Sequence, residues 1–204
     1  MRPRIGLFGG TFDPPHLGHT ILAAEAFEQL QLTRLLWVLT AVPPHKEGQP
    51  ITALEHRLGM VRRALEASPE FELSRLDIDR PPPHYALDTV RLASGLFPGA
   101  DVIYLLGGDS LRDLPRWHEP AAFVAACGQI GVMRRPGDAV DLAGLESALP
   151  GLSGKLAFVD APLLEISSSE IRRRARAGRA FRHYLQPPVY EYVASNNLYA
   201  PSIP

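Results

Sequence analysis

The sequence contains one cysteine, Cys127, among its 204 residues. A single thiol can form neither an intrachain disulfide nor the set of thiolate ligands that a cysteine-based metal site requires. Because Cys127 ends the apolar run 121–127, we predict a buried and unreactive thiol. The sequence therefore excludes a fold that is stapled by disulfides, and it predicts no metal site in the protein.

An excess of charge and long apolar runs are also missing. The 21 Lys and Arg residues nearly balance the 22 Asp and Glu residues, which gives a formal net charge of −1. Because binding to a nucleic-acid polymer usually requires a basic surface, we expect no nucleic-acid partner. No run is long enough to cross a bilayer, and residues 1–4 lead into an apolar stretch that lacks the features of a signal peptide. We therefore expect no membrane partner and a cytoplasmic location, while a homo-oligomer stays open.

Short apolar runs alternate with helical patterns along the chain. They predict strands at 4–8, 35–39, 71–73, 102–106, 130–133 and 156–159, and helices at 17–30, 54–65, 88–97, 142–149, 167–178 and 189–194. Such alternation predicts an α/β fold with a doubly wound, mostly parallel sheet and helices on both faces. The length fits one domain, 1–204, with the C-terminal helical part, about 165–204, packed on it.

The stretch Gly9–His19, with the sequence GGTFDPPHLGH, lies between the first predicted strand and the first predicted helix. Glycines let the backbone approach a ligand, and Pro14 and Pro15 at the helix start lack only N–H groups that have no intrahelical partner. The remaining N–H groups and the helix dipole favour an anion. His16 and His19 share one face of the first turn and can both carry protons. The combination predicts a polyphosphate site rather than a merely tight turn.

Two further segments offer groups for anion binding. Lys46 follows the second predicted strand, at the edge of the sheet where ligands bind, although a lone lysine is more often solvated surface. Ser167 and Ser168 open a predicted helix, and Arg172 follows one turn later on the same side. On spacing alone, a plain N-cap before a solvated helix is the simpler interpretation. Two capping-box patterns are present: Thr52 with Glu55 precedes the helix at 54–65, and Ser167 with Glu170 opens the helix at 167–178.

These residues resemble the signatures of the nucleotidyltransferase superfamily. Gly9–His19 is similar to its G-x-F-D-P-x-H-x-G-H loop, which holds the triphosphate of a nucleotide, and 166–172 is similar to its I-S-S-T-x-I-R segment, with Ser169 in place of threonine. Within the superfamily, the likeness to bacterial nicotinate-nucleotide adenylyltransferases runs along nearly the whole chain. The resemblance implies a Rossmann-like nucleotidyltransferase fold. It also implies an enzyme of NAD biosynthesis that joins nicotinate mononucleotide to the AMP part of ATP, with pyrophosphate leaving and Mg²⁺ arriving with ATP.

The resemblance also implies which residues contact the substrates. Asp109 follows a predicted strand as the family's ribose-binding acid does, although an aspartate there can also just stabilise a turn. The catalytic residues would be His16, His19, Lys46 and Arg172. ATP would contact Gly9, Gly10, Thr11, Phe12, His16, His19, Gly107, Asp109, Ile166, Ser167, Ser168 and Arg172. Nicotinate mononucleotide would contact Lys46, Tyr85, Ala86, Trp117, His118 and Arg134.

Three features of the acceptor site decide what it binds. Trp117 matches the tryptophan on which the family stacks the pyridine ring, the alternative being a tryptophan packed in the core. Ala86 stands where the family usually has threonine, so a contact to the nicotinate carboxylate depends on its backbone N–H. His118 replaces what is often another aromatic residue.

The implied reaction is a direct in-line attack without a covalent intermediate, because no serine or cysteine lies beside a base. Other acceptors within the superfamily are the nearest alternatives: nicotinamide mononucleotide, phosphopantetheine or the substrate of a cytidylyl transfer. Outside the enzymes, the alternatives are a non-catalytic nucleotide-binding protein and an RNA-binding module that uses residues 172–182.

Overall fold

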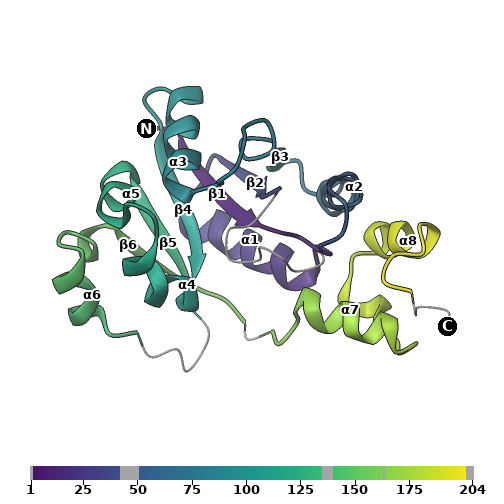
Figure 1. The fold of residues 1–204 in the computed structure, drawn as a ribbon. Coiled ribbons are helices and arrows are strands. Elements are labelled where there is room, and N and C mark those ends of the chain that lie inside the picture. Colours follow the sequence, from purple (N-terminus) through teal and green to yellow (C-terminus); the bar gives the residue numbers. More distant parts are fainter. Residues whose placement is uncertain (1, 42–50, 135–139, 163, 201–204) are drawn as a thin grey trace.

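The computed structural model describes residues 2–41, 51–134, 140–162 and 164–200, in which strands and helices alternate (Figure 1). The strands are β1 (Arg4–Gly10), β2 (Arg34–Leu39), β3 (Phe71–Ser74), β4 (Asp101–Gly107), β5 (Gln129–Arg134) and β6 (Leu156–Asp160). The α-helices are α1 (Leu17–Gln29), α2 (Leu54–Leu65), α3 (Ala86–Leu96), α4 (Gly108–Asp113), α5 (Pro120–Ala126), α6 (Leu142–Ala148), α7 (Ser168–Arg176) and α8 (Pro187–Ser195). The described residues also form the 3-10 turns η2 (Leu114–Arg116), η3 (Ser153–Lys155) and η4 (Arg182–Tyr184).

The strands form one sheet in the order β3-β2-β1-β4-β5-β6, and all neighbouring pairs run parallel. The chain moves outward from β1 to β3 and then returns to the other side of β1, so the order reverses between β1 and β4. Ligands of such sheets bind beyond the carboxyl ends of the strands at this switch point. Gly10 ends β1 and Gly107 ends β4, so both lie at the switch point. The predicted doubly wound α/β fold is confirmed.

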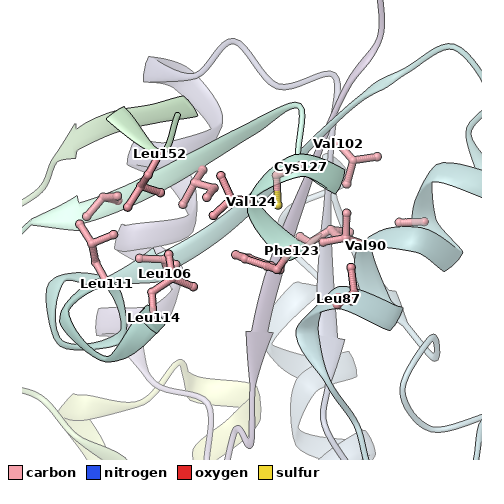
Figure 2. Close-up of a cluster of buried hydrophobic side chains, with 14 of the residues drawn as sticks. Leu87, Val90, Val102, Leu106, Leu111, Leu114, Phe123, Val124, Cys127 and Leu152 are labelled. Carbon is pink, nitrogen blue, oxygen red and sulfur yellow. The ribbon is translucent and has the colours of Figure 1, made fainter. Parts of the chain in front are cut away.

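Helices cover both faces of the sheet because successive strand residues point to opposite sides. In β4, Val102 and Leu106 belong to a buried cluster with α3, α4, α5 and α6 (Figure 2). Ile103 and Leu105 of the same strand belong to a second cluster with α1 and α2. Cys127 lies in the first cluster, so the predicted burial is confirmed, and that burial raises the pKa of its thiol to about 12, which disfavours the reactive thiolate.

Helices α4 and α5 are not among the elements that the sequence predicts. They have 6 and 7 residues, so neither spans enough turns to repeat an apolar position. The start of α4 at Gly108 means that a segment expected to be a turn begins a helix instead.

The starts of two longer helices also differ from the prediction. Helix α1 begins at Leu17 with His16 as its N-cap residue, so Pro14 and Pro15 precede the helix instead of opening it. Helix α2 follows Ala53 without a side-chain cap, so the capping box predicted at its start is wrong. The N–H group of Thr52 instead donates to a carboxylate oxygen of Asp13, 3.2 Å away.

Helices α7 and α8 pack against α2, at one end of the sheet (Figure 1). Ile171 and Val189 share a buried cluster with Met60 of α2. Val61 of the same helix belongs to the cluster beneath the sheet, so α2 takes part in both. We therefore propose that the chain folds as one domain, with the C-terminal helical part packed on it as far as residue 200; residues 201–204 of the predicted part lie outside the described residues.

Replacement of Val189 by alanine tests this proposal. Val189 is fully buried, so Val189→Ala is expected to lower the free energy of unfolding by on the order of 2 kcal/mol. In urea unfolding, the circular dichroism and tryptophan fluorescence midpoints should move together, because one domain unfolds cooperatively. Leu92→Ala, at an exposed position, is the control and should change little. A fluorescence midpoint that stays unchanged while the circular dichroism midpoint falls would show two separate units.

Candidate active site

The loop after β1 is shaped by Phe12, whose ring folds back over Gly10. A Cβ atom on Gly10 would lie 2.7 Å from the Phe12 ring, so only glycine leaves room for it. Phe12 has a φ of 48°, and its ring stacks on Trp37 with 4.8 Å between the ring centroids. Gly10 is therefore needed for packing within the protein, whereas the sequence suggested close approach of a ligand.

His16 and His19 meet at the start of α1, as the sequence predicts. Their ring centroids are 3.7 Å apart, and the backbone N–H of His16 donates to Nδ1 of His19 over 3.2 Å. A neutral imidazole that accepts at Nδ1 carries its proton on Nε2. His19 in its neutral form is thus a hydrogen-bond donor at Nε2.

Burial decides the charge of His16. The side chain is 6% exposed, and loss of hydration lowers its pKa from 6.5 to about 4. The ring is therefore neutral at physiological pH, so His16 carries one ring proton there and no positive charge. No described residue hydrogen-bonds to its Nδ1 atom. A neutral imidazole still offers one N–H donor to a phosphate oxygen.

The N-terminus of α7 is joined directly to the loop after β1. The Ser168 hydroxyl donates to the Pro14 carbonyl over 2.8 Å. Arg172 donates to the Asp13 carbonyl over 2.6 Å and lies 3.9 Å from the Asp13 carboxylate. Ser167 caps α7 by accepting from the Glu170 backbone N–H, as predicted. The two anion sites predicted from the sequence therefore lie side by side, with two helix N-termini meeting there.

Helix α4 carries two of the predicted ATP contacts. Gly107 is its N-cap residue, and an added Cβ would meet no atom within 4 Å, so the backbone faces open space there. The Asp109 side chain in the first turn is 73% exposed and accepts a hydrogen bond from Arg112. The structure brings both residues to the switch point, and their contact with ATP stays a prediction.

Trp117 lies between η2 and α5 and is half-buried. Its ring centroid is 5.3 Å from that of Phe123 and 6.2 Å from that of Tyr104. The Tyr104 hydroxyl in turn lies beneath Gly9, 3.1 Å from the position of an added Cβ. Trp117 thus packs on the core with part of its surface and leaves the rest accessible, and its stacking on a pyridine ring stays a prediction.

Tyr85 and His118 stack on each other with 4.0 Å between centroids and an interplanar angle of 17°. Both are predicted contacts of nicotinate mononucleotide, and the structure brings them together from segments 33 positions apart. Tyr85 is the N-cap residue of α3 and Ala86 is the first residue of the helix. The Ala86 N–H group is therefore one of those at a helix start that have no intrahelical partner.

A buried polar network holds the backbone at Tyr85. Arg80 donates to the Tyr85 carbonyl over 3.1 Å and to the Asp77 carboxylate over 3.0 Å. The Thr89 hydroxyl donates to the same carboxylate over 2.6 Å. Burial lowers the pKa of the neighbouring His84, which favours its neutral form.

Two predicted site residues cannot be placed. Lys46 lies outside the described residues, and only the backbone of Arg134, the last residue of β5, is described. The roles of both stay predictions.

Two buried charged residues carry no predicted role. Asp13 is 4% exposed and Arg57 is 2% exposed. Arg57 lies three residues after Leu54 and four before Val61, on the apolar face of α2. A charged residue on an apolar helical face is the sequence signal that could have identified Arg57.

Among the described residues, no group of three or more His, Cys, Asp and Glu side chains could hold a metal ion. In the same part of the chain, no helix is both long and apolar enough to span a membrane.

The neutral state of His16 gives a pH dependence that can be measured. Its pKa is 6.5 when unfolded and about 4 when folded, so the unfolded state binds more protons between these values. The contribution to stability is complete above pH 6.5 and is lost as the pH falls to about 4. Between pH 6.5 and pH 4, the free energy of unfolding of the wild type should fall by about 3 kcal/mol more than that of His16→Gln, as measured by urea unfolding at each pH. An imidazole of His16 that titrates near 6.5 in an NMR experiment would contradict the assignment.

Comparison with known proteins identifies the family. The family model of cytidylyltransferase-like proteins matches residues 7–174. A probable nicotinate-nucleotide adenylyltransferase of Thermomicrobium roseum is 43% identical over 196 residues, which cover 96% of this chain and 91% of that protein. One from Thermus thermophilus is 41% identical over 196 residues, which cover 96% of this chain and 99% of that protein.

A solved structure shares the fold. Plasmodium falciparum nicotinic acid mononucleotide adenylyltransferase complexed with NaAD aligns with a TM-score of 0.78 at 21% identity, covering 97% of this chain and 98% of that one. From the matched family model and the identity to these bacterial relatives, this chain belongs to the nicotinate-nucleotide adenylyltransferase family of cytidylyltransferase-like proteins.

Proposed function

We propose that this protein joins nicotinate mononucleotide to the AMP moiety of ATP, forming nicotinate adenine dinucleotide and pyrophosphate in NAD biosynthesis. The names of its bacterial relatives support this activity. The observation that carries it is the meeting of the N-termini of α1 and α7 beside His16 and His19. Two helix N-termini, two imidazoles and Arg172 together favour a ligand with several negative charges.

The reaction requires placement more than activation. A phosphate oxygen of nicotinate mononucleotide attacks the α-phosphorus of ATP, and the bond from that phosphorus to the bridging oxygen of the β-phosphate breaks. The attacking phosphate is already an anion, so no strong base is needed. Catalysis then comes from alignment of the two substrates and from stabilisation of the charge that develops.

The residues of the loop after β1 are proposed to bind the triphosphate. Thr11 and the backbone N–H groups at the start of α1 would contact phosphate oxygens. So would the backbone N–H of Ser168 at the start of α7, because the Ser168 hydroxyl donates to the Pro14 carbonyl. His16 and His19 would donate hydrogen bonds to the α-phosphate and to the departing pyrophosphate. Since His16 is neutral, it would supply a hydrogen bond rather than a charge. Lys46 and Arg172 would supply the positive charge.

The start of α3 is proposed to receive the nicotinate end of the acceptor. Trp117 would stack on the pyridine ring beside the Tyr85–His118 pair. The Ala86 N–H group at the N-terminus of α3 would bind the carboxylate, because an N-terminal helix end favours an anion. A side-chain hydroxyl is therefore not required at residue 86.

The protein is proposed to act on small molecules alone and in the cytoplasm. Mg²⁺ would arrive as part of the substrate, bound mainly by the phosphate oxygens of ATP, because this ion prefers phosphate oxygens to a cage of protein ligands.

Pyrophosphate release with ATP and each candidate acceptor tests the proposal. Nicotinate mononucleotide is expected to exceed nicotinamide mononucleotide by about tenfold or more in kcat/KM, because only the acid complements the start of α3. Phosphopantetheine and CTP-dependent acceptors should give none. Faster release with the amide would make this a nicotinamide-nucleotide enzyme, and release with neither would leave a nucleotide-binding protein.

Replacement of His19 tests the role of the histidine pair. His19→Ala is expected to lower kcat on the order of 10²–10³-fold, as is usual when a group that stabilises developing charge is lost. His183→Ala, at an exposed position in η4, is the matched control. Circular dichroism should show both variants folded. Turnover of His19→Ala at the wild-type rate would remove His19 from the mechanism.

A further inference from the structure

Arg57 is a buried arginine whose hydrogen bonds to the described residues go to four backbone carbonyls. Its guanidinium donates to Thr52 (2.9 Å), Thr11 (3.2 Å), Thr40 (2.8 Å) and Ala41 (2.7 Å). Thr11 follows β1, Thr40 and Ala41 follow β2, and Thr52 precedes α2. One side chain therefore joins three segments at the carboxyl ends of two neighbouring strands.

Burial of this charge is costly, because the guanidinium loses its hydration. That loss lowers the pKa of Arg57, while the nearby Asp13 and Tyr199 act in the opposite direction. An apolar side chain of similar volume is often as good for stability at such a position. Its planar fork of donors, however, can bind several carbonyls at fixed angles, which neither an apolar side chain nor lysine can do. The chemistry of Arg57 therefore suits the fixing of backbone positions more than the gain of stability.

Asp13 connects this arginine to the C-terminal segment. Its carboxylate accepts hydrogen bonds from the Tyr199 hydroxyl over 2.6 Å and from the Thr52 N–H over 3.2 Å. Tyr199 lies after α8 and packs in the cluster that contains Met60, with its hydroxyl 3.7 Å from the Met60 sulfur. The loop after β1 is thus held at Thr11 by α2 and at Asp13 by the C-terminal segment.

We propose that Arg57 and Tyr199 are positioning residues for the ATP site, which hold Thr11 and Asp13 so that the loop after β1 fits the triphosphate. They touch neither substrate. The inference rests on the proposed function, because it needs this loop to be the ATP site. It predicts that a change in α2 or in the C-terminal segment weakens ATP binding while leaving the acceptor site intact.

Steady-state kinetics of Tyr199→Phe is the first test, since this variant removes one hydroxyl and keeps the packed ring. The KM for ATP is expected to rise about tenfold, and the KM for nicotinate mononucleotide should stay within about twofold, because a shift of about 1 Å at a positioned group can cost on the order of 10²-fold. Tyr184→Phe, in the same C-terminal part, is the matched control and should keep both constants. A purely structural role would lower apparent kcat through the folded fraction and leave both KM values unchanged.

Arg57→Lys and Arg57→Met give the second test, with Arg62→Met on the exposed side of α2 as control. The KM for ATP should rise most in Arg57→Met and less in Arg57→Lys, whose ammonium group can bind some of the four carbonyls. If Arg57→Met does not fold, the KM values for ATP of Arg57→Lys and Tyr199→Phe test the inference. Folded variants with wild-type KM for ATP would overturn the inference. An inactive wild type would instead contradict the proposed function. The inference would then be tested by calorimetry, in which the Kd for ATP should be higher for the variants than for the wild type.

Discussion

The backbone of the loop after β1 is held by side chains that come from distant parts of the chain. Arg57 binds the Thr11 carbonyl, Arg172 binds the Asp13 carbonyl and Ser168 binds the Pro14 carbonyl. Buried backbone polar groups must find partners, and this loop, which belongs to no regular element, finds them in α2 and α7. The shape of the candidate site therefore depends on how the C-terminal helices pack against α2.

The electrostatics of the site follow from the same burial. His16 lies at the N-terminus of α1, where both loss of hydration and the positive end of the helix dipole disfavour a second ring proton. Positive potential for an anion then comes from the helix ends and from the Arg172 guanidinium, which also pairs with the Asp13 carboxylate.

The sequence predicts the sheet well because strand and helix periods are strong signals. The apolar runs at 35–39 and 102–106 lie within β2 and β4, and the expected switch point has its glycines at the strand ends. Other features depend on tertiary contacts: α4 and α5 are too short for a period, and the neutral His16 depends on burial. Asp13 and Arg57 find their partners only after distant segments meet. Lys46, which the family resemblance alone selects, stays a prediction.

A crystal structure with a non-hydrolysable ATP analogue measures the central claim most directly. The triphosphate should lie between the starts of α1 and α7, with phosphate oxygens within hydrogen-bond distance of His16, His19 and Ser168. An analogue bound in another cleft, with the loop after β1 contacting no phosphate, would contradict the proposed function even though the fold is that of the family.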